Sequence, residues 1–171
     1  TIDTNSTTTN RADITIGAVT GGSNTLTLTT ENNITGSDVT ASGNISGVTT
    51  LTLTDVGGTA TLSGDVDVTT LTVGNTVANV ALNGDGSSVA TQVLFANDGT
   101  LQLGDATGDT ITFSEEVRTT SVGGTVTLNG TFISSNDGLT FGAVTLGSNT
   151  TLNTNATSDA GQITFNGAIT G

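Results

Sequence analysis

The sequence predicts an all-β fold, and specifically a parallel β-solenoid (a β-helix) with about 25 residues in each coil. About a quarter of the 171 residues are Thr, and β-branched residues favour extended strands because they pack well on a pleated surface. Apolar residues alternate with Thr, which is the period of a strand with one buried face. Strand phrases also recur: TLTLT begins at Thr25 and at Thr50, and related strings begin at positions 100, 125 and 150.

Longer repeats connect the two ends of the chain. ITIGAVTGGSNT at 14–25 matches LTFGAVTLGSNT at 139–150 in nine of twelve positions. TIDTNST at 1–7 resembles TLNTNAT at 151–157, and the last ten residues repeat the phrase that starts at Asp13. Between positions 54 and 100 the register is looser, which indicates an insertion, a deletion or a shifted corner. Because the end returns to the register of the beginning, we expect residues 1–171 to be a single segment from a longer array.

The alternation predicts which side chains face the interior. In the phrase at 25–29, a period of two places both Leu side chains on one face and the three Thr side chains on the other. Stacking such pairs from coil to coil produces a narrow, continuous apolar column. The same logic applied along the chain gives the predicted inward pairs Leu26 and Leu28, Leu51 and Leu53, Leu71 and Val73, Leu101 and Leu103, Val126 and Leu128, Ile14 and Ile16, Val80 and Leu82, Ile111 and Phe113, Leu139 and Phe141, and Ile163 and Phe165.

An antiparallel fold is the alternative, because a tandem β-sandwich also alternates strands and turns. Gly, Asn and Asp clusters break the strands at short intervals in either architecture. The short internal period and the absence of Trp, Tyr and Pro favour the solenoid. The lack of Pro also suits long backbone ladders, since each Pro removes a hydrogen-bond donor.

The composition predicts that the chain is not an enzyme. It contains no His and no Cys, and Lys and Arg together number two, so the groups that carry most acid–base and nucleophilic chemistry are missing. The net charge of −13 disfavours nucleic acid and anionic membranes as partners. No stretch approaches the ~20 apolar residues of a membrane span, and without Cys there is no disulfide framework. Neither a nucleic-acid partner nor membrane insertion is expected.

One turn is a candidate calcium site. Asn83, Asp85 and Ser87 place oxygen-bearing side chains at alternate positions, as at the start of a calcium loop. The bidentate Glu that ends such a loop is missing, and so is a nonapeptide array. No cofactor is expected other than a structural calcium ion at such a turn, and ordinary turn chemistry is the default explanation of these residues. The other turn acids that offer similar ligands are Asp98, Asp105, Asp109 and Asp137.

Carboxylate pairs raise the question of glycoside hydrolysis, which uses two carboxyl groups at a defined separation. Asp65 and Asp67 share one face of a strand, and Glu115 and Glu116 are adjacent. The chain has no Trp or Tyr on which a sugar ring would stack. We therefore interpret both pairs as solvated surface charge.

Outward Thr rows suggest a second function. If the period holds, Thr side chains of one coil lie beside those of the next, and such a regular array resembles the face of ice-binding β-helix proteins. Stacked hydroxyl and methyl groups also favour strand pairing without any ligand, and Gln102 and Thr151 interrupt the array. The rows are predicted to join Thr25, Thr27 and Thr29 to Thr50, Thr52 and Thr54.

The phrases ITFNGAITG, TVTLNG, TLTLT and LTFGAVTLGSNTTLNTN resemble the repeats of filamentous-haemagglutinin-like and autotransporter-like bacterial surface adhesins. The resemblance covers nearly the whole chain and is densest from Gly123 to Gly171. It implies a secreted, right-handed β-helix at the cell surface or in an extracellular filament, with a structural or adhesive role. The expected partners are neighbouring repeats or other copies of the chain, and host or cell-surface glycans. No catalytic residue is implied.

Overall fold

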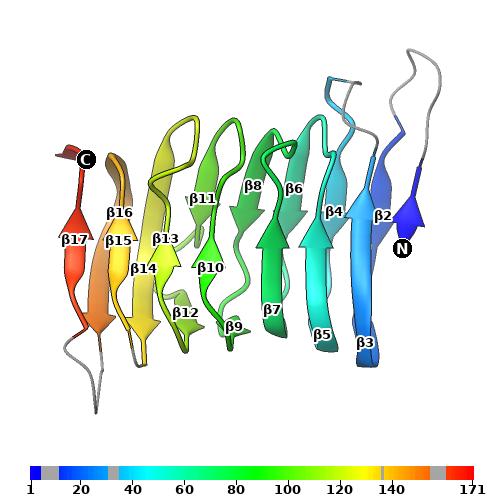
Figure 1. Ribbon diagram of the computed structural model, residues 1–171, viewed down its shortest axis with the longest axis horizontal. Helices are drawn as coiled ribbons and strands as arrows, with labels where there is room; N and C mark the ends of the chain where they lie inside the picture. Colours follow the sequence, from blue (N-terminus) through cyan, green and yellow to red (C-terminus); the bar gives the residue numbers. More distant parts are fainter. Residues whose placement is uncertain (5–11, 31–34, 136, 155–160) are drawn as a thin grey trace.

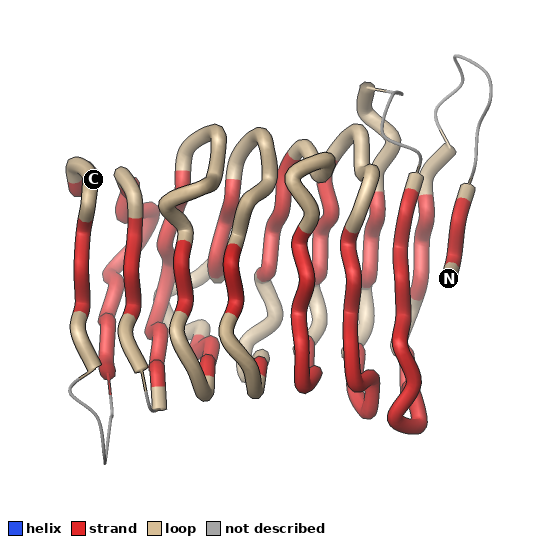
Figure 2. The backbone as a smooth tube through the Cα atoms, viewed as in Figure 1, coloured by secondary structure: helices blue, strands red, loops and turns tan. Residues whose placement is uncertain are grey.

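The chain forms a parallel β-solenoid of about seven coils (Figure 1). The computed structural model describes residues 1–4, 12–30, 35–135, 137–154 and 161–171. All regular elements in these ranges are strands, and none of the described residues is helical (Figure 2). Every pairing between strands is parallel. The solenoid prediction is therefore confirmed, and the antiparallel sandwich is excluded.

Each coil contributes strands to three stacked ladders, which we name from their positions in Figure 1. The rear ladder contains β2 (Ile14–Ile16), β4 (Val39–Ala41), β6 (Thr59–Leu62), β8 (Asn79–Leu82), β11 (Leu101–Leu103), the first parts of β14 (Val126–Ser134) and β16 (Val144–Thr154), and β18 (Ile169–Thr170). The lower ladder contains the first parts of β3 (Val19–Thr29), β5 (Ile45–Leu53) and β7 (Val66–Val73), then β9 (Ser88–Val89), β12 (Thr110–Phe113) and the second parts of β14 and β16. The front ladder contains β1 (Ile2–Asp3), the second parts of β3, β5 and β7, then β10 (Val93–Leu94), β13 (Val117–Arg118), β15 (Leu139–Phe141) and β17 (Ile163–Phe165).

The solenoid is right-handed. In Figure 1 the front strands run upward and the rear strands run downward, while the chain advances from the N-terminal end on the right to the C-terminal end on the left. Seen from its N-terminal end, the chain turns clockwise as it recedes. Fourteen strands form one continuous sheet because the long strands bend from one ladder into the next, and β10, β13, β15 and β17 form a separate front sheet.

A single apolar column fills the interior, and the alternation identified most of it. Sixteen residues of the ten predicted pairs are buried, whereas Ile16, Leu26 and Phe165 are half-buried. The remaining one, Ile163, is 43% exposed because it belongs to the last coil, where the column has a neighbour on one side only. The ring of Phe165 nevertheless stacks on Phe141, with centroids 5.3 Å apart.

The predicted coil length holds only in part. On the rear ladder Ile14 pairs with Val39 and Leu101 pairs with Val126, both at the predicted spacing. In the middle of the chain the coils shorten to roughly 21 residues, and the step from Val126 to Val144 is shorter still. The looser register noticed between positions 54 and 100 is this shortening. The corners account for it, because a corner can lose residues without changing the strands that it joins.

The repeated phrases do not occupy the same ladder in every coil. The expectation that matching phrases share one register is therefore wrong. Ile14 lies on the rear ladder, whereas its sequence counterpart Leu139 lies on the front ladder. The regularly spaced strand phrases drift similarly, from the front ladder at Thr25 and Thr50 to the rear ladder at position 126. The period of these phrases exceeds the common coil length of roughly 21 residues, so equivalent phrases advance around the coil. The match between 1–7 and 151–157 falls partly outside the described residues.

Candidate functional site

The candidate calcium turn follows β8 at the corner between the rear and lower ladders. The side-chain oxygen of Asn83 accepts a hydrogen bond from the Gln102 amide at 3.0 Å. A carboxylate oxygen of Asp85 accepts the backbone N–H of Thr110, also at 3.0 Å. Both partners belong to the next coil, so these two side chains join adjacent coils.

Ser87 makes the corresponding connection to the preceding coil. Its hydroxyl oxygen accepts the backbone N–H of Val66 at 3.0 Å and its O–H donates to the carbonyl of Gly84 at 2.8 Å. The side chain is fully buried. All three predicted ligands thus have structural hydrogen bonds, and calcium binding by them stays a prediction.

A second turn acid, Asp109, organises its own loop. One carboxylate oxygen accepts the backbone N–H groups of Asp105 and Ala106 at 2.6 and 2.8 Å. Asp109 is buried, whereas the side chain of Asp105 is exposed. Hydrogen bonds to a charged acceptor are stronger than neutral ones, so this carboxylate holds the loop between β11 and β12 in shape.

Replacing Asp109 with alanine is expected to lower the free energy of unfolding by about 2 kcal/mol, because two backbone N–H groups lose a charged acceptor that is itself buried. Urea denaturation followed by circular dichroism measures the change. Asp105→Ala is the matched control, since it removes an exposed carboxylate from the same loop and keeps the N–H that Asp109 accepts. If the two substitutions lowered the free energy of unfolding equally, the Asp109 carboxylate would not be what holds this loop in shape.

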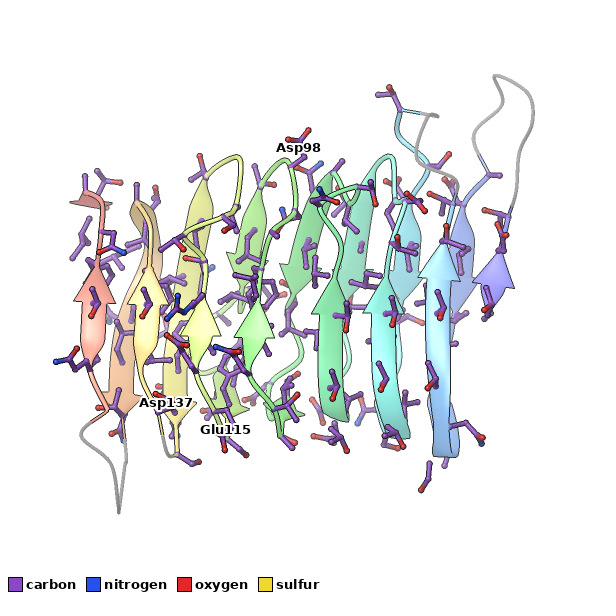
Figure 3. The ribbon with its side chains drawn as sticks, in the orientation of Figure 1. Asp98, Glu115 and Asp137 are labelled. Carbon is purple, nitrogen blue, oxygen red and sulfur yellow. The ribbon has the colours of Figure 1, made fainter. Side chains whose placement is uncertain are left out.

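The other acidic side chains are not gathered in one place. Asp98 lies at the upper turns, while Glu115 and Asp137 lie toward the lower turns (Figure 3). Asp137 accepts the N–H of the next residue, Gly138, at 2.8 Å. Asp98 therefore lies apart from Glu115 and Asp137, which each precede a strand of the front ladder.

The carboxylate pairs belong to contacts between coils. Asp65 accepts a hydrogen bond from the Asn44 amide at 3.1 Å, and Asp67 accepts the Ser88 hydroxyl at 2.8 Å. Each partner lies 21 residues away, which is one coil.

Glu116, which directly precedes β13, has side-chain partners in its own coil and in the preceding one. It accepts the Arg118 guanidinium at 2.7 Å and the Gln92 amide at 2.6 Å. Gln92 belongs to the preceding coil. Because the Arg118 side chain is 51% exposed, solvent screens this ion pair and its contribution to stability is small.

The predicted Thr rows exist, but they are narrower than expected. Thr25 pairs with Thr50 and Thr27 pairs with Thr52, as predicted. Thr29 does not extend the rows because it is buried. Thr54 does not extend them either, because its hydroxyl donates to Asp55 at 3.3 Å.

A row of side-chain caps along the rear ladder was missed. One carboxylate oxygen of Asp13 accepts the N–H of Asp38 at 2.9 Å, and Asp38 in turn accepts the N–H of Thr59 at 2.8 Å. Asn79 accepts the N–H of Thr100 at 2.9 Å in the same way. The sequence did carry a signal, because an Asp or Asn stands at the start of the similar strings DITI, DVTA and NVAL.

Shortened corners leave an open hollow beside the lower ladder. Four residues separate Thr20 from Thr25, but three separate Ser46 from Thr50 and two separate Asp67 from Thr70. The hollow has a volume of about 270 Å³ and is lined mainly by hydroxyl groups and one carboxylate, from Ser23, Thr49, Asp67, Thr69 and Ser88. Such a surface offers hydrogen bonds, and one of them is already made inside it, from the Ser88 hydroxyl to the Asp67 carboxylate.

Among the residues that the structure describes, no three His, Cys, Asp or Glu side chains lie close enough together to hold a metal ion. The described part of the chain also has no helix that is long and apolar enough to cross a membrane. Comparisons with protein-family models, with curated proteins and with solved structures found no match to this chain.

Proposed function

We propose that this chain is a structural repeat segment that forms a stiff rod in a secreted bacterial surface protein or an extracellular filament. The observation that carries the proposal is that adjacent coils are connected all around their circumference. Parallel backbone ladders run along the rear, lower and front faces. A single apolar column lies inside them, so bending the rod would strain backbone bonds and core contacts together.

Side-chain hydrogen bonds at the corners add to these connections. The bond from Asn44 to Asp65 and the bond from Ser88 to Asp67 each join two adjacent coils, on opposite sides of the coil that contains both Asp residues. The caps at Asp13 and Asn79 join further pairs of adjacent coils. Polar residues at the corners therefore hold the coils in register, which is a structural role and requires no ligand.

The extracellular location rests on composition and on the adhesin resemblance. A net charge of −13 with no Cys keeps a rod soluble through self-repulsion and independent of redox conditions. Neighbouring repeats or further copies of the chain are the natural partners at the two ends, since unpaired strand edges there accept more strands. Adhesion to cell-surface glycans remains a further part of the proposal.

Pulling the chain from its two ends in a single-molecule force experiment tests the proposal. A load-bearing solenoid is expected to unfold coil by coil, because each coil contacts only its neighbours. Coils of roughly 21 residues predict length increments of about 70 Å at ~3.3–3.6 Å per residue. Extension without discrete steps at low force would contradict a load-bearing role.

A further inference from the structure

The N-terminal half of the front ladder carries a two-dimensional array of outward Thr side chains. Thr25, Thr50 and Thr70 form one row across three coils. Thr27, Thr52 and Thr72 form a second row, two residues further along the same strands. We name these six residues the threonine lattice.

The backbone and the core fix the positions of the lattice. Each strand places a Leu between its two Thr residues, and Leu51 and Leu71 are buried beneath the lattice. Within a row, neighbouring Thr residues are ~4.8 Å apart, the distance between paired strands. The two rows are ~6.6 Å apart, because they are two residues apart along each strand. Branching at Cβ also restricts each Thr side chain to few rotamers, so the hydroxyl and methyl groups repeat with little freedom.

The hydroxyl groups of the lattice are available to a ligand. Only Thr70 has a side-chain partner among the described residues, the hydroxyl of Thr91 at 3.2 Å. The other five hydroxyls make no hydrogen bond within the described part of the chain. Other Thr hydroxyls are used internally, such as that of Thr30, which donates to the carbonyl of Asp55 at 3.2 Å.

The six side chains of the lattice are also uncharged. On the same ladder, one later coil carries the charged side chains of Glu116 and Arg118. On the rear ladder, the Thr row that includes Thr40 runs beside the carboxylates of Asp13 and Asp38. The lattice is therefore a neutral region that repeats with two regular periods across three coils.

We propose that the threonine lattice binds ice. A ligand that matches a repeating neutral array must itself repeat at fixed spacings, and the water molecules at a crystal face do so. Each Thr offers a hydroxyl that donates and accepts hydrogen bonds and a methyl group against which water orders. A glycan would stack on aromatic side chains, and the lattice consists of Thr alone. This activity goes beyond the structural role proposed above.

Ice-affinity partitioning and thermal hysteresis of the 171-residue chain test the proposal. The unaltered protein is expected to enter a slowly growing ice hemisphere and to depress the freezing point below the melting point. Exclusion from the ice together with absence of hysteresis would overturn the proposal without any variant.

Two matched variants locate the activity. Thr52→Tyr places a bulky ring at the centre of the lattice, and Thr61→Tyr places the same ring on the rear ladder, where Thr61 is also outward and half-exposed. Tyr is favoured in strands, so neither substitution should disturb the backbone. Thermal melting shows whether each variant keeps its fold. If Thr52→Tyr unfolds, Thr27→Tyr takes its place as the lattice variant. Loss of ice binding in the lattice variant alone supports the proposal. Equal loss in both variants, or none in either, overturns it.

Discussion

Gly64→Ala is expected to lower the free energy of unfolding by about 3 kcal/mol, the upper part of the range for overpacking. A Cβ atom on Gly64 would lie 2.6 Å from the backbone nitrogen of Asn44 in the preceding coil. Gly43 meets Ala18 in the same way at 2.6 Å, and Gly84 would meet backbone atoms of the coil that contains Gly64. The atoms in the way belong to the backbone, so a rotamer change cannot relieve the clash.

Gly17→Ala is the matched control, because a Cβ atom there meets nothing within 4 Å. Its stability is expected to stay the same or to rise by about 0.5 kcal/mol, since Ala reduces the conformational freedom of the unfolded chain. Urea denaturation of both variants measures the difference. If Gly64→Ala were as stable as Gly17→Ala, the close approach of the coils at this corner would be refuted.

The strands and their inward faces could be predicted because they are local properties of the sequence. The alternation around Leu51 and Leu53 identifies the buried face without any knowledge of the neighbouring coil. The same rule finds Val80 and Leu82, where the flanking residues are not Thr. A period of two is a property of the strand itself.

The register between coils could not be predicted in the same way. Ile14 and Leu139 occupy nearly identical phrases on different ladders, because all three ladders require the same pattern of apolar residues inside and Thr outside. A phrase that suits every ladder cannot indicate which one it occupies. The corner lengths decide, and they vary between coils, as the short step from Val126 to Val144 shows.

The polar side chains of the turns were interpreted too narrowly. Asp85 and Ser87 were considered as calcium ligands, and the structure gives both of them backbone partners one coil away. The caps at Asp38 and Asn79 were missed for a related reason. A sequence motif relates a turn residue to its neighbours along the chain, whereas its partner in a solenoid lies about one coil away, before or after it.

Leu53→Ala is expected to have an effect at least as large as that of Gly64→Ala, about 3–4 kcal/mol. Leu53 is fully buried and stands in register between Leu28 and Val73 on the front ladder. Backbone hydrogen bonds hold the coils on both sides at the spacing of paired strands, ~4.8 Å. The surroundings therefore cannot collapse into the space that the side chain leaves. The variant then loses both the free energy of burying the removed atoms and the further free energy that an open cavity costs.

Leu94→Ala separates this cavity effect from the general cost of losing a leucine. Leu94 lies on the same ladder but faces outward and is 50% exposed, so its truncation is expected to change stability by less than about 0.5 kcal/mol. Because the coils interact as a chain of neighbours, Leu53→Ala also weakens the two interfaces on either side of its own coil. Hydrogen exchange should then rise most in the strands beside Leu53, at β3 and β7. A uniform rise over all coils would contradict a stack stabilised by contacts between neighbours, and with it the mechanical basis of the proposed rod.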